Sequence, residues 1–239
     1  MKLTVALALL PLVSAVPANK PKPKPAPLKY PGLDVLAKRV GLLYFGTAVD
    51  NVVLDNSQYV SIARNRSEFG QATPANGQKW MYIEPKQNVF NYSMGDVIIK
   101  PAIKAGQMRR CHAFVWHNQL PEWLEKGNWT KPALTKVLEN HIKNEARHYY
   151  DQCYAWDVVN EAFEDNGTLR DTIFLRVLGK EYIELAFKFA RRYTSPRTRL
   201  YYNDYGIERV NNKSIAVAAM GEYLDWREEP FIQTQADSL

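Results

Sequence analysis

The sequence predicts an α/β fold in which parallel strands close into a (β/α)8 barrel surrounded by helices. Short apolar segments alternate with longer segments whose apolar residues recur every three or four positions, the pattern of successive strand–helix units. No hairpin signal separates these segments, and no glycine-rich phosphate loop such as GxGxxG is present. Because an open doubly wound sheet usually carries such a loop after its first strand, the barrel is favoured.

Five segments are predicted to be strands, since each is short, apolar and followed by polar residues. Val158 and Val159 form the middle of the fourth, and two adjacent apolar residues are typical of a strand buried on both faces. The predicted strands are residues 42–49, 71–73, 110–116, the segment around Val158 and Val159, and 199–203.

Helices are predicted between and after these strands, and the third has the clearest signals. Thr130 is a good N-cap, and Pro132 falls in the first turn, where proline is tolerated. Leu134, Leu138 and Ile142 then recur every four residues, which gives the apolar stripe of a helix lying on a sheet. The predicted helices cover residues 58–69, 97–105, about 130–151, 171–192 and 213–226.

The first 30 residues are expected to lie outside the folded domain. Residues 1–18 have the basic start, apolar run and small-residue cleavage site of a secretory signal peptide. Residues 19–30 are rich in proline and lysine and are predicted to form an extended linker, which leaves 31–239 as one domain. No later segment is long and apolar enough to span a membrane. We therefore expect a secreted, extracellular protein that does not bind a membrane.

The basic net charge of the chain does not indicate a nucleic-acid partner. Five of the 31 Lys and Arg residues lie in 1–30, which holds no Asp or Glu, so that 26 basic and 25 acidic residues remain for the domain. A nucleic-acid-binding domain would carry the basic excess itself.

Secretion makes disulfides and glycosylation available to this chain. Cys111 and Cys153 are its two cysteines, and the sequence leaves open whether they pair or are buried free thiols on neighbouring strands. Five triplets fit the N-glycosylation pattern, and we expect some of them to be unused: Asn65, Asn91, Asn128, Asn166 and Asn212.

Polar and aromatic residues gather where the predicted strands end. Asn160 and Glu161 end the fourth strand abruptly, and a carboxylate held half out of water at such a point tends to have a raised pKa and can serve as a general acid. Alternatively, Asn160 caps a following helix and Glu161 interacts with its N-terminal dipole. This segment alone leaves both interpretations open. The other strand ends contribute Asn76, Lys79, Trp80, His112, Trp116, His117, Asn118, Gln119, Asn203, Asp204 and Tyr205.

Carboxylate, amide, imidazole and indole groups along one rim are typical of a carbohydrate-binding cleft, although any single aromatic residue is more readily explained as core.

The histidines lack the HExxH spacing of a zinc site, so we expect no metal or cofactor. We expect His112 and His117 to hydrogen-bond a carboxylate or a sugar hydroxyl. There is no GxSxG motif, and neither cysteine has the surroundings of a nucleophile.

Five motifs, in chain order, resemble glycoside hydrolase family 10, whose members are mainly secreted endo-β-1,4-xylanases with a (β/α)8 barrel. The resemblance runs from about Leu33 to about Asp225. It implies that Glu161 is the acid/base residue, that Asn160 contacts the sugar 2-hydroxyl, and that six further residues line the substrate cleft: Asn76, Lys79, His112, Trp116, Gln119 and Tyr205. The motifs are FGTAVDN (45–51), TPANGQKW (73–80), CHAFVWHNQLPEW (111–123), WDVVNEAFED (156–165) and LYYNDYGIE (200–208).

The sequence departs from the family pattern in two places. Ala75 stands where the family usually has glutamate, which removes a hydrogen-bonding carboxylate from the glycone side of the cleft. The family's nucleophile, a glutamate in a TELD-like segment after strand seven, has no counterpart in this chain. A retaining glycosidase needs two carboxylates about 5–5.5 Å apart. We therefore expect about five of the eight strand–helix units, with 31–239 as a catalytic domain that is incomplete at its C-terminus, most simply a piece of a longer gene product.

The expected function is that of a secreted, monomeric, retaining glycosidase that cleaves internal β-1,4-xylosidic bonds of xylan with Glu161 as general acid/base. Two alternatives remain open. One is a catalytically impaired form that acts at most as a carbohydrate-binding protein, and the other is a family member that acts on another β-linked glycan or glycoside.

Overall fold

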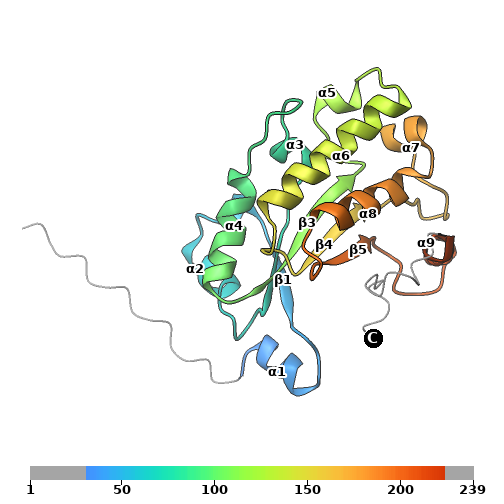
Figure 1. Ribbon diagram of the computed structural model, residues 1–239. Coiled ribbons are helices and arrows are strands. Elements are labelled where there is room, and N and C mark those ends of the chain that lie inside the picture. Colours follow the sequence, from blue (N-terminus) through green and yellow to red (C-terminus); the bar gives the residue numbers. More distant parts are fainter. Residues whose placement is uncertain (1–30, 224–239) are drawn as a thin grey trace, which may run out of the picture. The chain divides into compact units, whose positions relative to one another are not determined.

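The computed structural model describes residues 31–223, which belong to one compact unit built on a five-stranded parallel sheet (Figure 1). The strands follow chain order across the sheet, and each neighbouring pair is parallel. The predicted signal peptide and linker lie outside the described residues. The strands are β1 Gly46–Val49, β2 Gln71–Pro74, β3 Met108–Trp116, β4 Ala155–Asn160 and β5 Arg199–Asn203.

Helices connect the strands, and α4, α6 and α8 lie along one face of the sheet (Figure 1). None of the described helices is long and apolar enough to cross a bilayer. The helices are α1 Leu33–Arg39, η1 Asn51–Val53 (a 3-10 turn), α2 Ser57–Ala63, α3 Trp80–Ile83, α4 Ser93–Lys104, α5 Glu122–Glu125, α6 Lys131–His148, α7 Ile173–Leu178, α8 Tyr182–Tyr193 and α9 Asn212–Tyr223.

Helix α6 confirms the prediction made from its capping and apolar residues. The Thr130 hydroxyl accepts a hydrogen bond from the Ala133 amide at 3.4 Å, and the helix begins at Lys131. Leu134, Leu138 and Ile142 are fully buried against the sheet side of the molecule. The four-residue spacing therefore identified the face of this helix that builds the core.

The main core lies between the sheet and these helices. All six residues of β4 are buried, and the Trp156 ring stacks on Phe114 of β3 with 3.9 Å between ring centroids. Cys111 of β3 and Cys153, just before β4, form a disulfide with Cα atoms 5.8 Å apart. The question that the sequence left open is thus answered in favour of pairing, and the bond joins two neighbouring strands.

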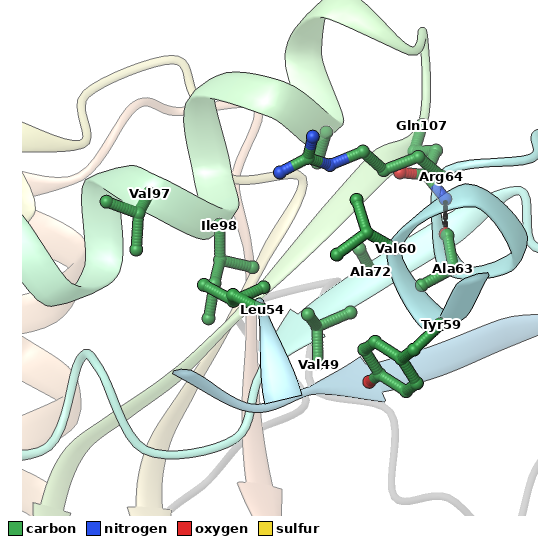
Figure 2. A pocket seen from close by; sticks show the side chains of 11 residues that line it. Val49, Leu54, Tyr59, Val60, Ala63, Arg64, Ala72, Val97, Ile98 and Gln107 are labelled. Carbon is green, nitrogen blue, oxygen red and sulfur yellow. Dashed lines mark hydrogen bonds between the residues drawn. The ribbon is translucent and has the colours of Figure 1, made fainter. Parts of the chain in front are cut away.

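A smaller core cluster lies near the first two strands, around a pocket of about 20 Å³ (Figure 2). Its apolar lining comes from β1, α2, β2 and α4. The Gln107 side-chain amide closes one end by donating to the carbonyl oxygens of Ala63 at 2.9 Å and Phe69 at 2.8 Å. This arrangement fixes the end of α2 against the start of β3. The buried members are Val49, Ala63, Ala72, Ile98 and Ala102.

Three predicted elements differ from the structure. The helix predicted over 171–192 is two helices, because Gly179 adopts a φ of 78° and ends α7 before α8 begins. The first strand pairs only from Gly46 rather than from residue 42, and the helix predicted over 58–69 ends at Ala63. The last three residues of the helix predicted over 213–226 lie outside the described part of the chain.

The face of the sheet opposite α4, α6 and α8 borders an open groove of about 860 Å³. Its lining is polar and aromatic and includes Tyr44, Arg110, Asp157 and Tyr201. Within residues 31–223, β1 and β5 each pair with one neighbour, so these five strand–helix units do not close into a ring.

Candidate functional site

The predicted site residues lie at the edge of the sheet where the parallel strands end. Trp116, the last residue of β3, is paired in register with Asn160 of β4, and Asn160 is paired with Asn203 of β5. Val49 of β1 pairs with Pro74 of β2 at the same edge. The sheet therefore gathers residues that are separated by more than 100 positions in the sequence.

Glu161 lies at this edge, directly after β4. Its side chain is 22% exposed, and its Oε2 atom accepts a hydrogen bond from the Trp116 indole at 2.9 Å. The His117 ring nitrogen Nδ1 is 4.0 Å from the same oxygen, too far for a hydrogen bond. Glu161 is thus a carboxyl group with one fixed oxygen and access to solvent.

The backbone at Glu161 has a φ of 54°, an uncommon value for a residue with a side chain. The turn is held by β5: the Glu161 amide donates to the Asn203 carbonyl at 2.8 Å, and the Ala162 amide donates to the Tyr202 hydroxyl at 2.9 Å. Among the described residues, no helix begins after this turn until Ile173. The alternative in which Asn160 caps a helix is therefore wrong.

Asn160 is buried, and its side-chain oxygen accepts a hydrogen bond from the Asn203 side chain at 2.7 Å. The Arg110 guanidinium in turn donates to the Asn203 oxygen at 3.1 Å. The orientation of the Asn160 amide is therefore set by its neighbours on β5 and β3 rather than by solvent.

Asn76 and Lys79 form a chain of hydrogen bonds on the β1–β2 side. The Lys79 ammonium donates to the Asn76 side-chain oxygen at 2.9 Å, and the Asn76 amide donates to Asp50 at 2.8 Å. The ammonium also lies 4.1 Å from the centroid of the Trp116 ring. Burial lowers the pKa of Lys79, while the charges of Glu161 and Asp50 oppose this shift. Lys79 thus lies where the charges of both Asp50 and Glu161 act on its ammonium.

His112 lies below this rim and hydrogen-bonds Asp157 through Nδ1 at 2.9 Å. Arg110 also binds Asp157, from Nε at 2.9 Å and from a terminal nitrogen at 2.6 Å. Burial by itself would raise the pKa of Asp157, but Arg110 and His112 outweigh it and hold the pKa below its usual range. An ionised Asp157 only accepts, so Nδ1 of His112 carries the proton of this hydrogen bond.

Gln119 and Tyr205 lie on the loops above the rim. Gln119 has a φ of 49°, and its buried side-chain oxygen has no hydrogen-bond partner among the described residues. Tyr205 is 52% exposed, and the Lys213 ammonium lies 3.3 Å from its ring centroid. An unpaired buried acceptor and an exposed aromatic ring are both suited to a polar ligand with apolar faces, such as a sugar.

Three charged residues of this region were absent from the predicted site: Asp50, Arg110 and Asp157. Asp157 did carry a signal, because a carboxylate inside an otherwise apolar, fully buried strand needs a partner. The identity of the partner, Arg110 on the adjacent strand, depends on the register between β3 and β4 and could not be read from the chain.

The parallel sheet, the helices that connect its strands and the polar residues at the strand ends are the arrangement of part of a (β/α)8 barrel. Residues 32–231 match the family description Glycosyl hydrolase family 10, and the chain belongs to this family. The resemblance seen in the motifs is thereby confirmed, as is the assignment of the five strand–helix units to a (β/α)8 barrel.

Proteins with similar sequences include endo-1,4-beta-xylanases from fungi. Endo-1,4-beta-xylanase A of Humicola insolens is 48% identical over 191 residues, which cover 77% of this chain and 50% of that protein. Endo-1,4-beta-xylanase D of Talaromyces funiculosus is 45% identical, with coverage of 76% and 44%. The chain thus spans about half the length of the curated relatives it matches.

Solved structures give the same result for the fold. Penicillium canescens endo-1,4-beta-xylanase XylE has a TM-score of 0.78 and 38% identity, covering 84% of this chain and 61% of that one. Xylanase 10B from Thermotoga petrophila RKU-1, solved in complex with xylobiose, has a TM-score of 0.79 and 36% identity, with coverage of 85% and 62%.

Proposed function

We propose that this chain carries the acid/base part of a secreted, monomeric, retaining glycosidase that cleaves internal β-1,4-xylosidic bonds of xylan. The observation that carries the proposal is the position of Glu161: a partly exposed carboxyl group at a strand end, with one oxygen fixed by Trp116 at 2.9 Å. Family membership and the names of the similar proteins support xylan as the substrate.

In this mechanism Glu161 acts twice. It first donates its proton to the oxygen of the leaving sugar, and it later removes a proton from the water that releases the glycosyl-enzyme. The hydrogen bond from Trp116 and the pinned backbone after β4 keep the carboxyl group in one orientation during both steps. General acid/base catalysis of this kind contributes roughly 10²- to 10⁴-fold to a rate.

The surrounding residues would bind the sugar. Asn160 would contact the 2-hydroxyl, while the hydrogen-bonded groups of Asn76, Lys79 and His112 would bind other hydroxyls of the glycone. Tyr205 would provide an aromatic face on the leaving-group side. Ala75 borders the groove without a hydrogen-bonding group of its own, so we expect weak binding of the sugar next to it.

The retaining mechanism also needs a nucleophilic carboxylate about 5–5.5 Å from Glu161. The matched relatives are about twice as long as the matched segment, and we propose that the nucleophile belongs to the part of the barrel that follows β5 in them. Without that carboxylate, sugar binding would remain and hydrolysis would be lost.

The first test measures reducing ends released from β-1,4-xylan by the 239-residue chain beside its Glu161→Gln variant. Release that disappears in the variant supports the acid/base role of Glu161 and would mean that another carboxylate, or water directly, replaces the nucleophile. Equal release from both would remove Glu161 from the mechanism. If neither releases sugar, binding of xylohexaose by calorimetry distinguishes a carbohydrate-binding form, which binds, from a protein of another function, which does not.

A second test addresses the glycan. Rates on xylan, β-glucan and aryl β-glycosides are compared at equal enzyme concentration. Preference for xylan supports the proposal, and preference for another polymer or for the small glycosides would favour the alternative substrate classes.

A further inference from the structure

Lys213, at the start of α9, is a buried lysine beside the proposed sugar-binding edge. Its side chain is 2% exposed. The ammonium lies 2.8 Å from Asp204, whose side chain is fully buried, and 3.3 Å from Asp165, whose side chain is 79% exposed. A buried ammonium is costly unless it is paired, and the buried carboxylate of Asp204 is the partner that offsets this cost.

The first contact that Lys213 makes with the site is with Tyr205. The ammonium lies 3.3 Å from the centroid of the tyrosine ring, within the range of a cation–π contact. Tyr205 is nevertheless 52% exposed, so much of the ring remains accessible to a ligand. Lys213 therefore contacts an aromatic ring that is also open to solvent.

The second contact runs through Asp204 to the backbone after Glu161. One oxygen of Asp204 accepts from the Tyr205 amide at 2.9 Å, and the other accepts from the Tyr202 hydroxyl at 2.5 Å. The same Tyr202 hydroxyl accepts a hydrogen bond from the Ala162 amide at 2.9 Å. The ammonium, the carboxylate and the phenol thus form one chain of contacts that ends next to Glu161.

The charge state of Lys213 is consistent with this arrangement. Burial by itself would lower the pKa of Lys213, but the hydrogen bond and the charge of Asp204 outweigh it and raise the pKa. The ammonium is therefore protonated throughout the neutral range. It provides a constant contact and not a titrating switch.

We infer that Lys213 is a positioning residue for sugar binding and for the acid/base turn, acting through the Tyr205 ring on one side and through Asp204 and Tyr202 on the other. The inference rests on the proposed function, because it takes Tyr205 as a surface for the leaving-group sugar. The contacts through Asp204 and Tyr202 matter because Glu161 has a positive φ, and a strained turn persists only where its surroundings hold it.

The first experiment is a double-mutant cycle on the full chain, with the Kd for xylohexaose measured by calorimetry. Lys213→Met should weaken binding about five- to tenfold, a size typical of residues in contact. In the Tyr205→Ala background, the same change should alter Kd less than twofold, because the ring through which Lys213 acts is absent. An equal loss in both backgrounds would overturn the role assigned to the ring.

Two control variants separate positioning from a loss of folding. Asp165→Asn removes the charge of the exposed partner of Lys213 and should leave Kd unchanged, because solvent screens a carboxylate that is 79% exposed. If Lys213→Met alone fails to fold, Lys213→Met/Asp204→Asn removes both buried charges together and takes its place in the cycle. Lys213→Arg keeps the charge and should recover part of the lost affinity.

The coupling of Lys213 to the Ala162 amide through Asp204 and Tyr202 is measured by NMR without a ligand. Lys213→Met should shift the Ala162 amide resonance and speed its hydrogen exchange, whereas Asp165→Asn should do neither. An unchanged chemical shift and exchange rate of the Ala162 amide would overturn the proposed coupling to Lys213. Failure of the wild-type chain to bind xylohexaose would contradict the proposed function, and the NMR result would still decide the coupling of Lys213 to Ala162.

Discussion

Glu161 and Glu145 are both glutamates beside a histidine and a tryptophan, yet their surroundings differ. Glu161 lies at the strand ends, 22% exposed, with the Trp116 indole donating to it at 2.9 Å and His117 4.0 Å away. Glu145, on α6, is fully buried, and its Oε2 lies 3.4 Å from Nε2 of His141. Residue types alone therefore do not distinguish the two.

The buried group is completed by two residues from α3 and the loop that follows it. Glu84 contacts Nδ1 of His141 at 3.0 Å, and the Trp80 ring stacks on the histidine with 3.7 Å between ring centroids. Burial raises the pKa of Glu145 to about 7, and the two carboxylates outweigh burial to raise the pKa of His141. A sugar has no access to this group. The comparison teaches that exposure at a strand end, and not the combination of residues, separates the proposed acid/base residue Glu161 from Glu145.

The largest expected difference between the two glutamates is in activity. In a full-length form that carries the nucleophile, Glu161→Gln should lower xylan hydrolysis roughly 10²- to 10⁴-fold, because it removes the proton that the leaving oxygen requires. The unfolding midpoint should stay the same, since a partly exposed carboxyl becomes an amide of equal size. Glu145→Gln is the matched control, and its rate should equal that of the wild type. A comparable loss of rate in both variants would contradict the proposal that Glu161, and not Glu145, takes part in catalysis.

The next effect is on stability and concerns His141. His141→Ala leaves two buried carboxylates without their cation and should lower the free energy of unfolding by about 3–5 kcal/mol in a denaturant titration. His148→Ala is the control, because His148 also stacks on an aromatic ring and pairs with a carboxylate, but its side chain is 29% exposed. Its loss should be clearly smaller. Equal losses would mean that the contribution of His141 to the free energy of unfolding does not depend on its burial.

The smallest effect is a pH dependence of stability. The folded protein keeps the Glu145 proton up to a pKa of about 7, whereas the unfolded chain releases it near 4.5. Between these values the folded state binds more protons, so stability falls as pH rises, by about 3 kcal/mol in all for this group. Glu145→Gln should flatten that slope in urea titrations at pH 5, 6 and 7. A slope unchanged by the substitution would assign the pH dependence to other groups.

Much of the architecture could be predicted because local patterns suffice for it. The apolar stripe of α6, its Thr130 cap and the apolar pair Val158 and Val159 are properties of neighbouring residues. The long helix predicted over 171–192 was wrong for a local reason as well, since Gly179 takes a left-handed conformation that periodicity does not report.

The site could be predicted only in part. Glu161 and Asn160 stood out because polar residues interrupt an apolar strand. The pairing of His112 with Asp157 and of Lys213 with Asp204 could not be predicted, because each pair joins different segments of the chain through strand register and helix placement.

The sequence by itself determined the order of the strands and of the longer helices between them, the family and the residues that end each strand, since these depend on short-range patterns and motifs. Only the tertiary structure decided that Cys111 and Cys153 pair, that Glu145 is buried while Glu161 is exposed, and that Lys213 reaches Tyr205. The physical reason is that pairing, burial and charge contacts depend on distances between residues far apart in the chain, and these distances exist only after the strands and helices have packed.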